Sequence, residues 1–204
     1  MCQRKQRDEA LKCEILRVHQ SNCDGVYGAK KVWKQLNREN ARVADLTYVK
    51  THIGWVYVAF IIDVFSRFIV GWQISTSLRS DLAIDALEMA IYGRNGNDLS
   101  ELIHHSDRGV QYLSIRYSEP LSEAEIVASV GSKGDSYDNA LAKSFNGLYK
   151  TELIHRQGPW RNIEHVQWAT LNYVDWFNNR RIHESLDYVS PVEFELSIKE
   201  EKTA

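Results

Sequence analysis

The sequence predicts an α/β protein built around a mixed β-sheet. Residues 43–75 contain three stretches rich in Val, Ile, Tyr, Phe and Trp that are joined by tight turns, which is typical of an antiparallel meander. A segment with helical apolar spacing follows, and then a short fourth strand and further helical segments. Three antiparallel strands, a helix, another strand and more helices together favour a layered α/β arrangement.

The elements are expected in the following order. Two short helices occupy residues 8–20 and 29–39, where apolar residues recur at helical intervals around a glycine-containing turn. Residues 114–124 are irregular or helical. Ser190, Pro191 and Glu193 have the pattern of a helix start. The remaining strands are expected at 43–49, 55–63, 67–75 and 102–106, and the remaining helices at 80–93, 138–153 and 163–178.

Length and composition exclude several protein classes. A chain of 204 residues, 44% of them apolar, suffices for one domain of ordinary size with a small appendage. We expect neither a membrane span nor a signal peptide, because apolar runs are short and the basic N-terminus lacks one, so we expect a cytoplasmic protein. Three cysteines, an odd number without C-x-x-C spacing, indicate reduced thiols rather than a disulfide framework or a zinc site.

Charge divides the chain near residue 43. Residues 1–42 hold ten Lys and Arg against five Asp and Glu, whereas residues 43–204 hold fifteen against twenty-two. We therefore expect a basic, helical, helix-turn-helix-like segment at 1–42 and a catalytic core with C-terminal helices at 43–204. A basic segment before an acidic body is compatible with nucleic-acid binding beside a metal site, although solvated helix faces give the same pattern.

Two aspartates lie within or directly after apolar strands, where a charged side chain is unusual. Asp45 interrupts the first apolar strand, and Asp107 follows the fourth. A polar side chain there requires a partner or a function, although aspartates also occur as harmless turn residues. Asp63 ends the second strand, where a turn-forming aspartate is commonplace, so we expect a structural role for it.

Ordered motifs along nearly the whole chain resemble the integrase core of insertion-sequence transposases, specifically the OrfB product of the insertion-sequence-three family, which is related to retroviral integrase. The opening helical segment, with VYGAKKVWKQLNRE at 26–39, is similar to the segment that precedes this core. The motifs of the core are ADLTYV at 44–49, AFIIDVFSRFIVGW at 59–72, HHSDRGVQY at 104–112, GDSYDNALAKSFNGLYKTEL at 134–153, WFNNRRIHESL at 176–186 and SPVEF at 190–194.

The resemblance implies a ribonuclease-H-like fold, with a mixed five-stranded sheet and helices on both faces. It also implies a DDE-type transposase that cleaves DNA and joins strands with Mg²⁺ or Mn²⁺, acting on element ends and target DNA. A homo-oligomer and an upstream-frame DNA-binding partner are further expectations from the family. Asp45 and Asp107 match the first two acidic residues, with 61 residues between them, and the third acid belongs after another 35 intervening residues.

That third position is Lys143. It lies about 200° around the helix from Leu141 and from Phe145, so we expect it to point away from the apolar stripe. Replacing a carboxylate with an ammonium removes a metal ligand, and like charges about 4 Å apart repel by about 4 kcal/mol at an effective dielectric of about 20. The second metal should bind poorly. Asp135, Asp138 and Glu152 are the nearest acids, but their positions make none a convincing substitute.

Other departures from the family indicate an internally deleted, decaying copy of a mobile-element gene. Pro120 falls inside a segment that the family makes helical, at a cost of about 3 kcal/mol unless the helix starts there. Glu125 stands where the family has a glycine in a left-handed conformation. The family also has several dozen residues between the helical segment and the first catalytic strand, and here NRENAR runs directly into VADLTY.

Basic residues in two places are candidates for binding DNA phosphates, with solvated surface as the alternative in both. Tyr173, Trp176 and Phe177 beside the second group are expected in the core rather than as stacking platforms. His104 and His105 face opposite sides of a strand, and a hydrogen-bonded structural role is expected for histidine there. The candidates are Lys30, Lys31, Lys34 and Arg38 in the early helix, and Arg180, Arg181 and His183 near the end.

We therefore expect a transposase integrase core whose catalysis is impaired by Lys143. The rival from another class is a non-catalytic DNA-binding or assembly protein that interferes with intact transposase. A nuclease of the ribonuclease H type would use the same fold and metals, but the NNRRIHESL block gives it no support.

Overall fold

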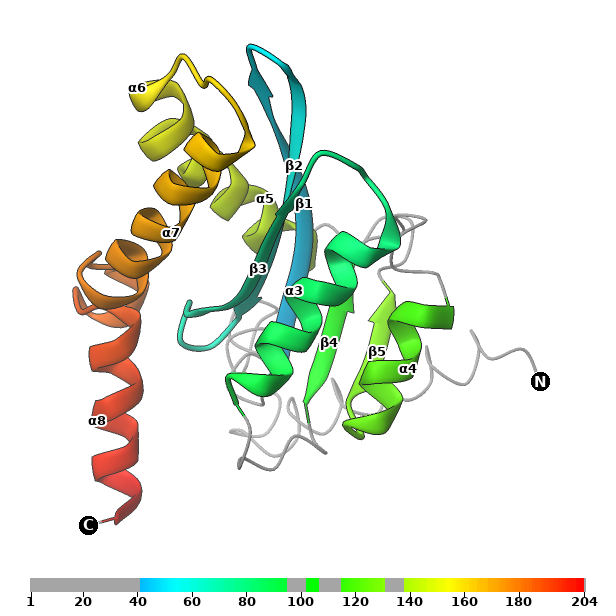
Figure 1. The fold of residues 1–204 in the computed structure, drawn as a ribbon. Helices are drawn as coiled ribbons and strands as arrows, with labels where there is room; N and C mark the ends of the chain where they lie inside the picture. Colours follow the sequence, from blue (N-terminus) through cyan, green and yellow to red (C-terminus); the bar gives the residue numbers. More distant parts are fainter. Residues whose placement is uncertain (1–40, 95–101, 107–114, 131–137, 204) are drawn as a thin grey trace.

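The computed structural model describes residues 41–94, 102–106, 115–130 and 138–203 (Figure 1). The predicted helices at 8–20 and 29–39 lie outside these residues. Within the described part, no helix has the length and apolar character needed to cross a bilayer.

Five strands form one mixed sheet with the order β3-β2-β1-β4-β5. The first three strands pair in antiparallel fashion, and β4 and β5 extend the sheet in parallel from β1. Their β-branched and aromatic residues suit a pleated sheet that is packed on both faces. The strands are β1 at Ala41–Thr51, β2 at Gly54–Asp63, β3 at Ile69–Ser75, β4 at Ile103–Ser106 and β5 at Val127–Val130.

Helices pack on both faces of this sheet, so the predicted α/β class is confirmed (Figure 1). A π-helical turn, η1, continues α5 directly, and a 3-10 turn, η2, precedes the last helix. The helices are α3 at Ser80–Tyr92, α4 at Ile115–Glu123, α5 at Asp138–Tyr149, η1 at Lys150–Ile154, α6 at His155–Gln157, α7 at Ile163–Asn179, η2 at Glu184–Leu186 and α8 at Pro191–Thr203.

Alternation along the strands divides the apolar side chains between two cores. On β2, Phe60 packs into a core with residues of α5 and α7, whereas Ile61 packs with residues of α3 and α4. Gly71 of β3 is needed where α3 crosses the sheet, because a Cβ there would lie 2.2 Å from the carbonyl oxygen of Ala86. The sheet is therefore a rigid platform between two helical layers.

β1 is longer than β4, and the candidate site lies where the pairing between these two strands ends. Only Ala41 to Ala44 of β1 pair with β4, and the last of these pairs joins Ala44 to Ser106. Beyond that point β1 continues to Thr51 in pairing with β2. Asp45 is thus the first residue of β1 past its pairing with β4.

The ends of the helices test the capping signals in the sequence. Ser190 and Glu193 form the expected capping box: Glu193 Oε2 accepts from the amide and the hydroxyl of Ser190, both at 2.8 Å. In contrast, α3 begins at Ser80, and Arg79 takes the cap position without a side-chain hydrogen bond. Pro120 does lie inside α4, and Glu125 has the left-handed backbone expected of it, with φ of 57°.

Candidate active site at the edge of β1

Asp45 is a half-buried carboxylate whose two oxygens both accept hydrogen bonds. Oδ1 accepts from the amide of Leu46 at 2.8 Å, and Oδ2 accepts from Nδ2 of Asn146 at 2.8 Å. These bonds fix the orientation of the carboxylate. The aspartate that interrupts the apolar strand is therefore tied to α5.

Asn146 is a residue of this site that sequence reasoning did not identify. Its amide nitrogen also lies 3.5 Å from the carbonyl oxygen of Leu46, while its Oδ1 is buried without a hydrogen-bond partner among the described residues. Its position on the polar face of α5, three residues after Lys143, was the available signal. Asn146 leaves a buried oxygen beside the carboxylate of Asp45.

Lys143 is exposed and lies between two contacts that hold α5 against β1. Ala142, its neighbour, is fully buried in a cluster with Val43 and Val64. Asn146 is three residues later, about 60° around the helix axis and about 4.5 Å along it. Position 143 therefore lies on the part of α5 that packs against β1 near Asp45. Its side chain is exposed and points away from the apolar stripe of α5, as expected.

Asp107 lies outside the described residues. The chain leaves β4 at Ser106, whose backbone is paired with Ala44, the residue before Asp45. Within the described ranges no cluster of three or more His, Cys, Asp or Glu side chains is suited to hold a metal ion.

Two other polar residues on the strands have structural roles. Asp63 Oδ1 accepts from the amides of Phe65 and Ser66 at 3.0 and 2.9 Å, which makes it a turn residue as predicted. His104 is buried, and its Nε2 lies 2.7 Å from the hydroxyl of Tyr117, as expected for a structural histidine. The side chain of His105 is not described.

Arg181 is part of a network inside the protein. Its guanidinium donates to Glu152, with the shortest bond at 2.7 Å, and its Nη1 lies 3.2 Å from Nδ1 of His183. Tyr173 donates its hydroxyl to the same carboxylate at 2.8 Å. Burial opposes the charge of Glu152, but the bonds from Arg181 and Tyr173 hold its pKa below the ordinary value.

The other candidate DNA contacts are distributed differently. Arg180 is exposed and pairs with Asp175 at 2.7 Å, and His183 is 8% exposed. Tyr173 and Phe177 are buried as predicted, whereas Trp176 is 37% exposed and the expectation of a core position was wrong for it. Lys30, Lys31, Lys34 and Arg38 lie outside the described residues.

A second feature that the sequence reasoning missed is an exposed surface where the β1–β2 hairpin meets η1 and α6. Tyr48 and Trp55 are 55% and 49% exposed and meet edge to face with ring centres 5.3 Å apart. The ammonium of Lys150 lies 4.4 Å from the centre of the Tyr48 ring. We define the hairpin-end surface as the exposed or half-buried side chains of Tyr48, Lys50, Trp55, Lys150, Arg156 and Arg161.

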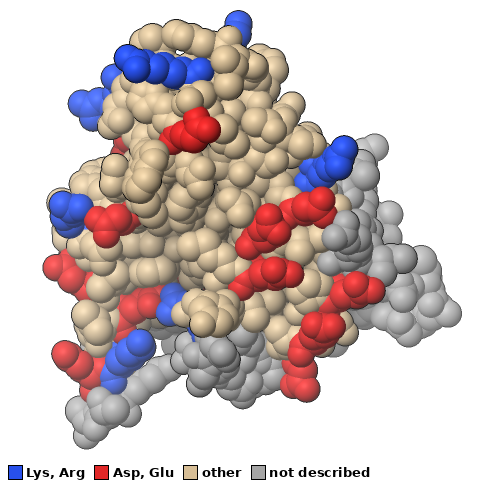
Figure 2. Space-filling view, viewed as in Figure 1, with Lys and Arg blue, Asp and Glu red and all other residues tan. Residues whose placement is uncertain are grey.

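This surface is continuous because the hairpin contacts the segment after α6. The amide of His52 donates to the carbonyl oxygen of Trp160 at 2.9 Å, immediately before Arg161. Figure 2 shows Lys and Arg side chains gathered at this end of the molecule, whereas acidic side chains dominate the part of this face over α3 and α4. The hairpin-end surface thus combines positive charge with exposed aromatic rings.

Comparison with protein families matches this chain to two descriptions of an integrase core domain, over residues 39–136 and 124–191. A transposase for insertion sequence element IS629 of Shigella sonnei is 43% identical over 244 residues, covering 94% of this chain and 81% of that protein. A protein of Mycobacterium tuberculosis, assigned as a transposase for insertion sequence element IS986/IS6110, is 42% identical over 248 residues, with coverages of 94% and 89%.

The length of the second alignment is informative. It extends over 248 positions although this chain has only 204 residues, so at least 44 aligned positions lack a residue of this chain. Within the aligned region, the relative therefore has at least 44 residues without a counterpart here.

Solved structures agree with the fold. The catalytic core domain of BIV integrase matches with a TM-score of 0.61 at 15% identity, covering 81% of this chain and 99% of that chain. The HTLV-2 integrase catalytic core domain in complex with magnesium, in its dimeric form, matches with a TM-score of 0.54 at 19% identity, covering 71% and 90%. The ribonuclease-H-like fold expected from the sequence is confirmed by these likenesses.

Proposed function

Because this chain belongs to the integrase-core family of insertion-sequence transposases, we propose that it is a DNA strand-transfer enzyme by descent whose catalysis is impaired at Lys143. The observation that carries this proposal is the bond between Asp45 and Asn146. It ties the first acidic position to the helix that carries position 143, one turn away.

The catalytic positions we propose are Asp45, Asp107 and the place of Lys143. The register of β1 and β4 supports the first two, since Ser106 pairs with Ala44 and each is followed directly by one of the aspartates. β4 ends at Ser106 while β1 continues, so Asp45 and the residue after Ser106 both follow the last pair that joins these two parallel strands. This is the arrangement that a shared divalent cation requires.

The residues present fit one hard cation better than two. Asp45 and the buried, unpartnered Oδ1 of Asn146 are oxygen donors of the kind that Mg²⁺ and Mn²⁺ prefer. Position 143 offers an ammonium where a second cation would need a carboxylate. We therefore propose that Mg²⁺ or Mn²⁺ binds at Asp45 and Asp107, and that the ammonium of Lys143 weakens a second site by removing a ligand and repelling the cation.

A missing segment is the second proposed defect. The aligned positions that lack a residue of this chain support the expectation of an internal deletion between the basic helical segment and β1. We propose a domain boundary immediately before β1, which begins at Ala41 rather than at the expected residue 43, with a helix-turn-helix-like remnant before it. A shortened connection would restrict how the basic segment reaches DNA while the core is engaged.

DNA is the proposed partner, and we place its contacts in several parts of the chain. The basic helix with Lys30, Lys31, Lys34 and Arg38 remains a candidate, together with exposed Arg180. Arg181 and His183 would act indirectly by supporting the segment that carries Arg180, because their side chains contact each other and Glu152. The hairpin-end surface adds exposed aromatic rings and cations next to the Asp45 strand.

Assembly and location follow from the same proposal. A homo-oligomer is proposed because the similar HTLV-2 integrase core is described in dimeric and trimeric forms. An upstream-frame DNA-binding partner is a further proposal from the family pattern. A chromosomal DNA substrate would place the protein in the bacterial cytoplasm, associated with the nucleoid when bound.

A second candidate function is interference with intact transposase by a non-catalytic DNA-binding or assembly protein. Lys143 favours it, because a folded core without a complete metal site would keep its surfaces while losing its chemistry. Both functions predict DNA binding, and only the first predicts that repair of position 143 restores strand joining.

Strand joining with repaired variants tests the proposal. Cleavage and joining would be measured on the element's terminal DNA with Mg²⁺ or Mn²⁺, for the unaltered chain, for Lys143→Glu and for Lys143→Gln. We expect the glutamate variant alone to gain activity, because Gln removes the cation without supplying a charged ligand.

Each outcome has a defined meaning. Inactivity of both variants, with Mn²⁺ binding recovered in the glutamate variant, would locate the defect in the missing segment. Strong joining by the unaltered chain would overturn the proposed impairment. Equal gains for Glu and Gln would show that charge repulsion, rather than a lost ligand, limits the site.

A further inference from the structure

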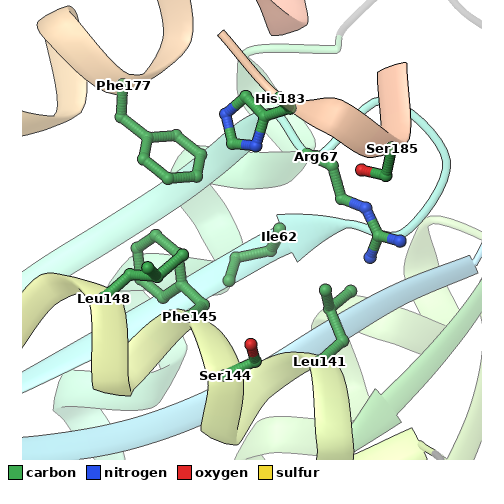
Figure 3. Close-up of a pocket in the computed structure, with 9 residues that line it drawn as sticks. All are labelled: Ile62, Arg67, Leu141, Ser144, Phe145, Leu148, Phe177, His183 and Ser185. Atoms are coloured by element: carbon green, nitrogen blue, oxygen red, sulfur yellow. The ribbon is translucent and has the colours of Figure 1, made fainter. Parts of the chain in front are cut away.

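A cavity of about 210 Å³ lies on the side of α5 that faces away from Asp45 (Figure 3). The helix contributes residues at positions i, i+3, i+4 and i+7, which form one face. Asn146 and Lys143 lie about 150° around α5 from the middle of that face. The lining residues are Ile62, Arg67, Leu141, Ser144, Phe145, Leu148, Phe177, His183 and Ser185.

Arg67 provides a cationic donor to this cavity. It follows β2 in a left-handed conformation with φ of 63°, and its amide donates to the carbonyl oxygen of Asp63 at 2.9 Å. Its Nη1 is buried and has no hydrogen-bond partner among the described residues. A buried guanidinium nitrogen without an acceptor is unfavourable, so this position requires one.

His183 provides a second donor, and its tautomer follows from its neighbour. Its Nδ1 lies 3.2 Å from Nη1 of Arg181, and a guanidinium can only donate. Nδ1 must therefore accept, which leaves the proton of the neutral ring on Nε2. That Nε2 is buried, and no described residue accepts from it.

The nearby carboxylates make no hydrogen bond to these two donors among the described residues. The charge of Asp63 attracts the guanidinium of Arg67, but its Oδ1 accepts from the amides of Phe65 and Ser66. Glu152 accepts from Arg181 and from Tyr173. The cavity therefore presents two unpaired donors, one of them cationic, with the hydroxyls of Ser144 and Ser185 on its walls and apolar side chains over the rest.

We propose that this cavity binds a small organic anion, a carboxylate carried on an apolar body, whose oxygens accept from Arg67 Nη1 and His183 Nε2. Figure 3 shows Arg67, His183 and Ser185 on one side of the space and the residues of α5 on the other, with Phe177 closing one end. Five apolar side chains suit a ring or branched alkyl group. The volume is below that of sites for drug-sized ligands, which restricts the ligand to the size of benzoate.

Water is the competing occupant. It could accept from both donors, but it would neither neutralise the guanidinium nor cover the apolar walls, as a carboxylate on a ring would. The two occupants differ in a measurable way. An anion should be preferred to a neutral molecule of the same shape.

The test compares benzoate with benzyl alcohol, which has the same ring without the charge. The methyl resonances of ¹³C-labelled isoleucine, including Ile62 on the cavity wall, would be followed during titration of the full chain. We expect a saturable shift for Ile62 with benzoate and a dissociation constant on the order of 1 mM. Benzyl alcohol should bind at least about tenfold more weakly.

Variants separate the cavity from nonspecific binding. Arg67→Met should weaken benzoate binding about tenfold or more, and Arg79→Met, which removes an exposed arginine outside the cavity, should leave it unchanged. If Arg67→Met does not fold, the comparison of the two ligands on the unaltered chain still decides. An Ile62 methyl that does not respond to benzoate, or responds equally to both ligands, would show that only water satisfies these donors and would overturn the proposal. Because this test uses no DNA or metal, its result is independent of strand transfer.

Discussion

Asp45 shows how a single residue acquires a fixed role from its surroundings. Its two carboxylate oxygens accept from a backbone amide and from Asn146, so the group is oriented before any ligand arrives. Lys143 acts in the opposite direction, because one substitution changes the formal charge at the third position by two. The orientation of the Asp45 carboxylate and the charge at position 143 therefore affect metal binding at the proposed site separately.

His183 makes stability depend on pH. Burial, the charge of Arg181 and the charge of Arg67 lower its pKa from 6.5 to about 4, so it is neutral in the folded protein and protonates more readily when unfolded. This contribution is complete above pH 6.5 and is lost as the pH falls towards 4. We expect the free energy of unfolding to decrease by on the order of 2 kcal/mol across that window, measured by urea denaturation.

The control for this prediction removes the titrating group. His183→Gln should flatten the change in stability between pH 7 and pH 5, whereas His155→Gln, at an exposed position on α6, should leave the slope intact. An unchanged slope in His183→Gln would assign the pH dependence to other residues.

At the scale of elements, α4 forms although one residue inside it and one residue just after it are unfavourable for their backbone conformations. Pro120 lacks the amide that an interior helical position uses, and Glu125 adopts a left-handed conformation just after the helix. Tyr117 and Leu121 of this helix are buried against the α3 core. Tertiary packing therefore compensates for poor local sequence.

Replacing Glu125 with glycine should stabilise the protein. Glycine occupies the left-handed region without the Cβ penalty, so Glu125→Gly should raise the free energy of unfolding by about 0.5–1 kcal/mol. Glu119→Gly is the matched control, because Glu119 is an exposed residue in the interior of α4, where glycine should cost about 1 kcal/mol. Both effects would be measured by chemical denaturation, and a loss of stability in Glu125→Gly would contradict the argument.

At the scale of the whole molecule, charge is distributed unevenly. Acidic side chains dominate the α3 and α4 side of the face in Figure 2, and basic ones gather at the hairpin and α6 end. The last helix, α8, is attached to the body through an ion pair between Arg94 and Glu195. Such a charge distribution favours approach of a polyanion at one end of the molecule.

The hairpin-end surface gives a direct prediction for DNA binding. Lys150→Ala should weaken binding to duplex DNA and reduce the slope of log affinity against log salt by about 0.9, because one phosphate contact is lost. Trp55→Ala should weaken binding to single-stranded DNA by roughly tenfold through loss of stacking. Fluorescence anisotropy at several salt concentrations would measure both effects.

A matched control distinguishes this surface from general charge. Lys199→Ala removes a lysine from α8, away from the hairpin end, and should change neither affinity nor slope by a comparable amount. Equal effects of Lys150→Ala and Lys199→Ala would argue against a localised DNA surface.

Local signals in the sequence determined much of the fold. Apolar periodicity located β1 to β4 and the helices α3, α5 and α7, and the pattern of Ser190, Pro191 and Glu193 located the start of α8. It did not predict the short strand β5 at Val127–Val130. The outward direction of Lys143 also followed from neighbouring residues, whereas the left-handed backbone at Glu125 was expected from the resemblance to the family. Asp107 and the early basic helix remain predictions, because they lie outside the described residues.

Tertiary structure alone decided which distant side chains meet. Arg181 looked like a phosphate contact, but its partner Glu152 lies 29 residues away and is brought to it by the packing of η1 beside the end of α7. The bond between Asn146 and Asp45, and the cavity between Arg67 and His183, likewise join segments that are far apart along the chain. Periodicity assigns a residue to a face of its own helix or strand, but the identity of the side chain opposite depends on how whole elements pack.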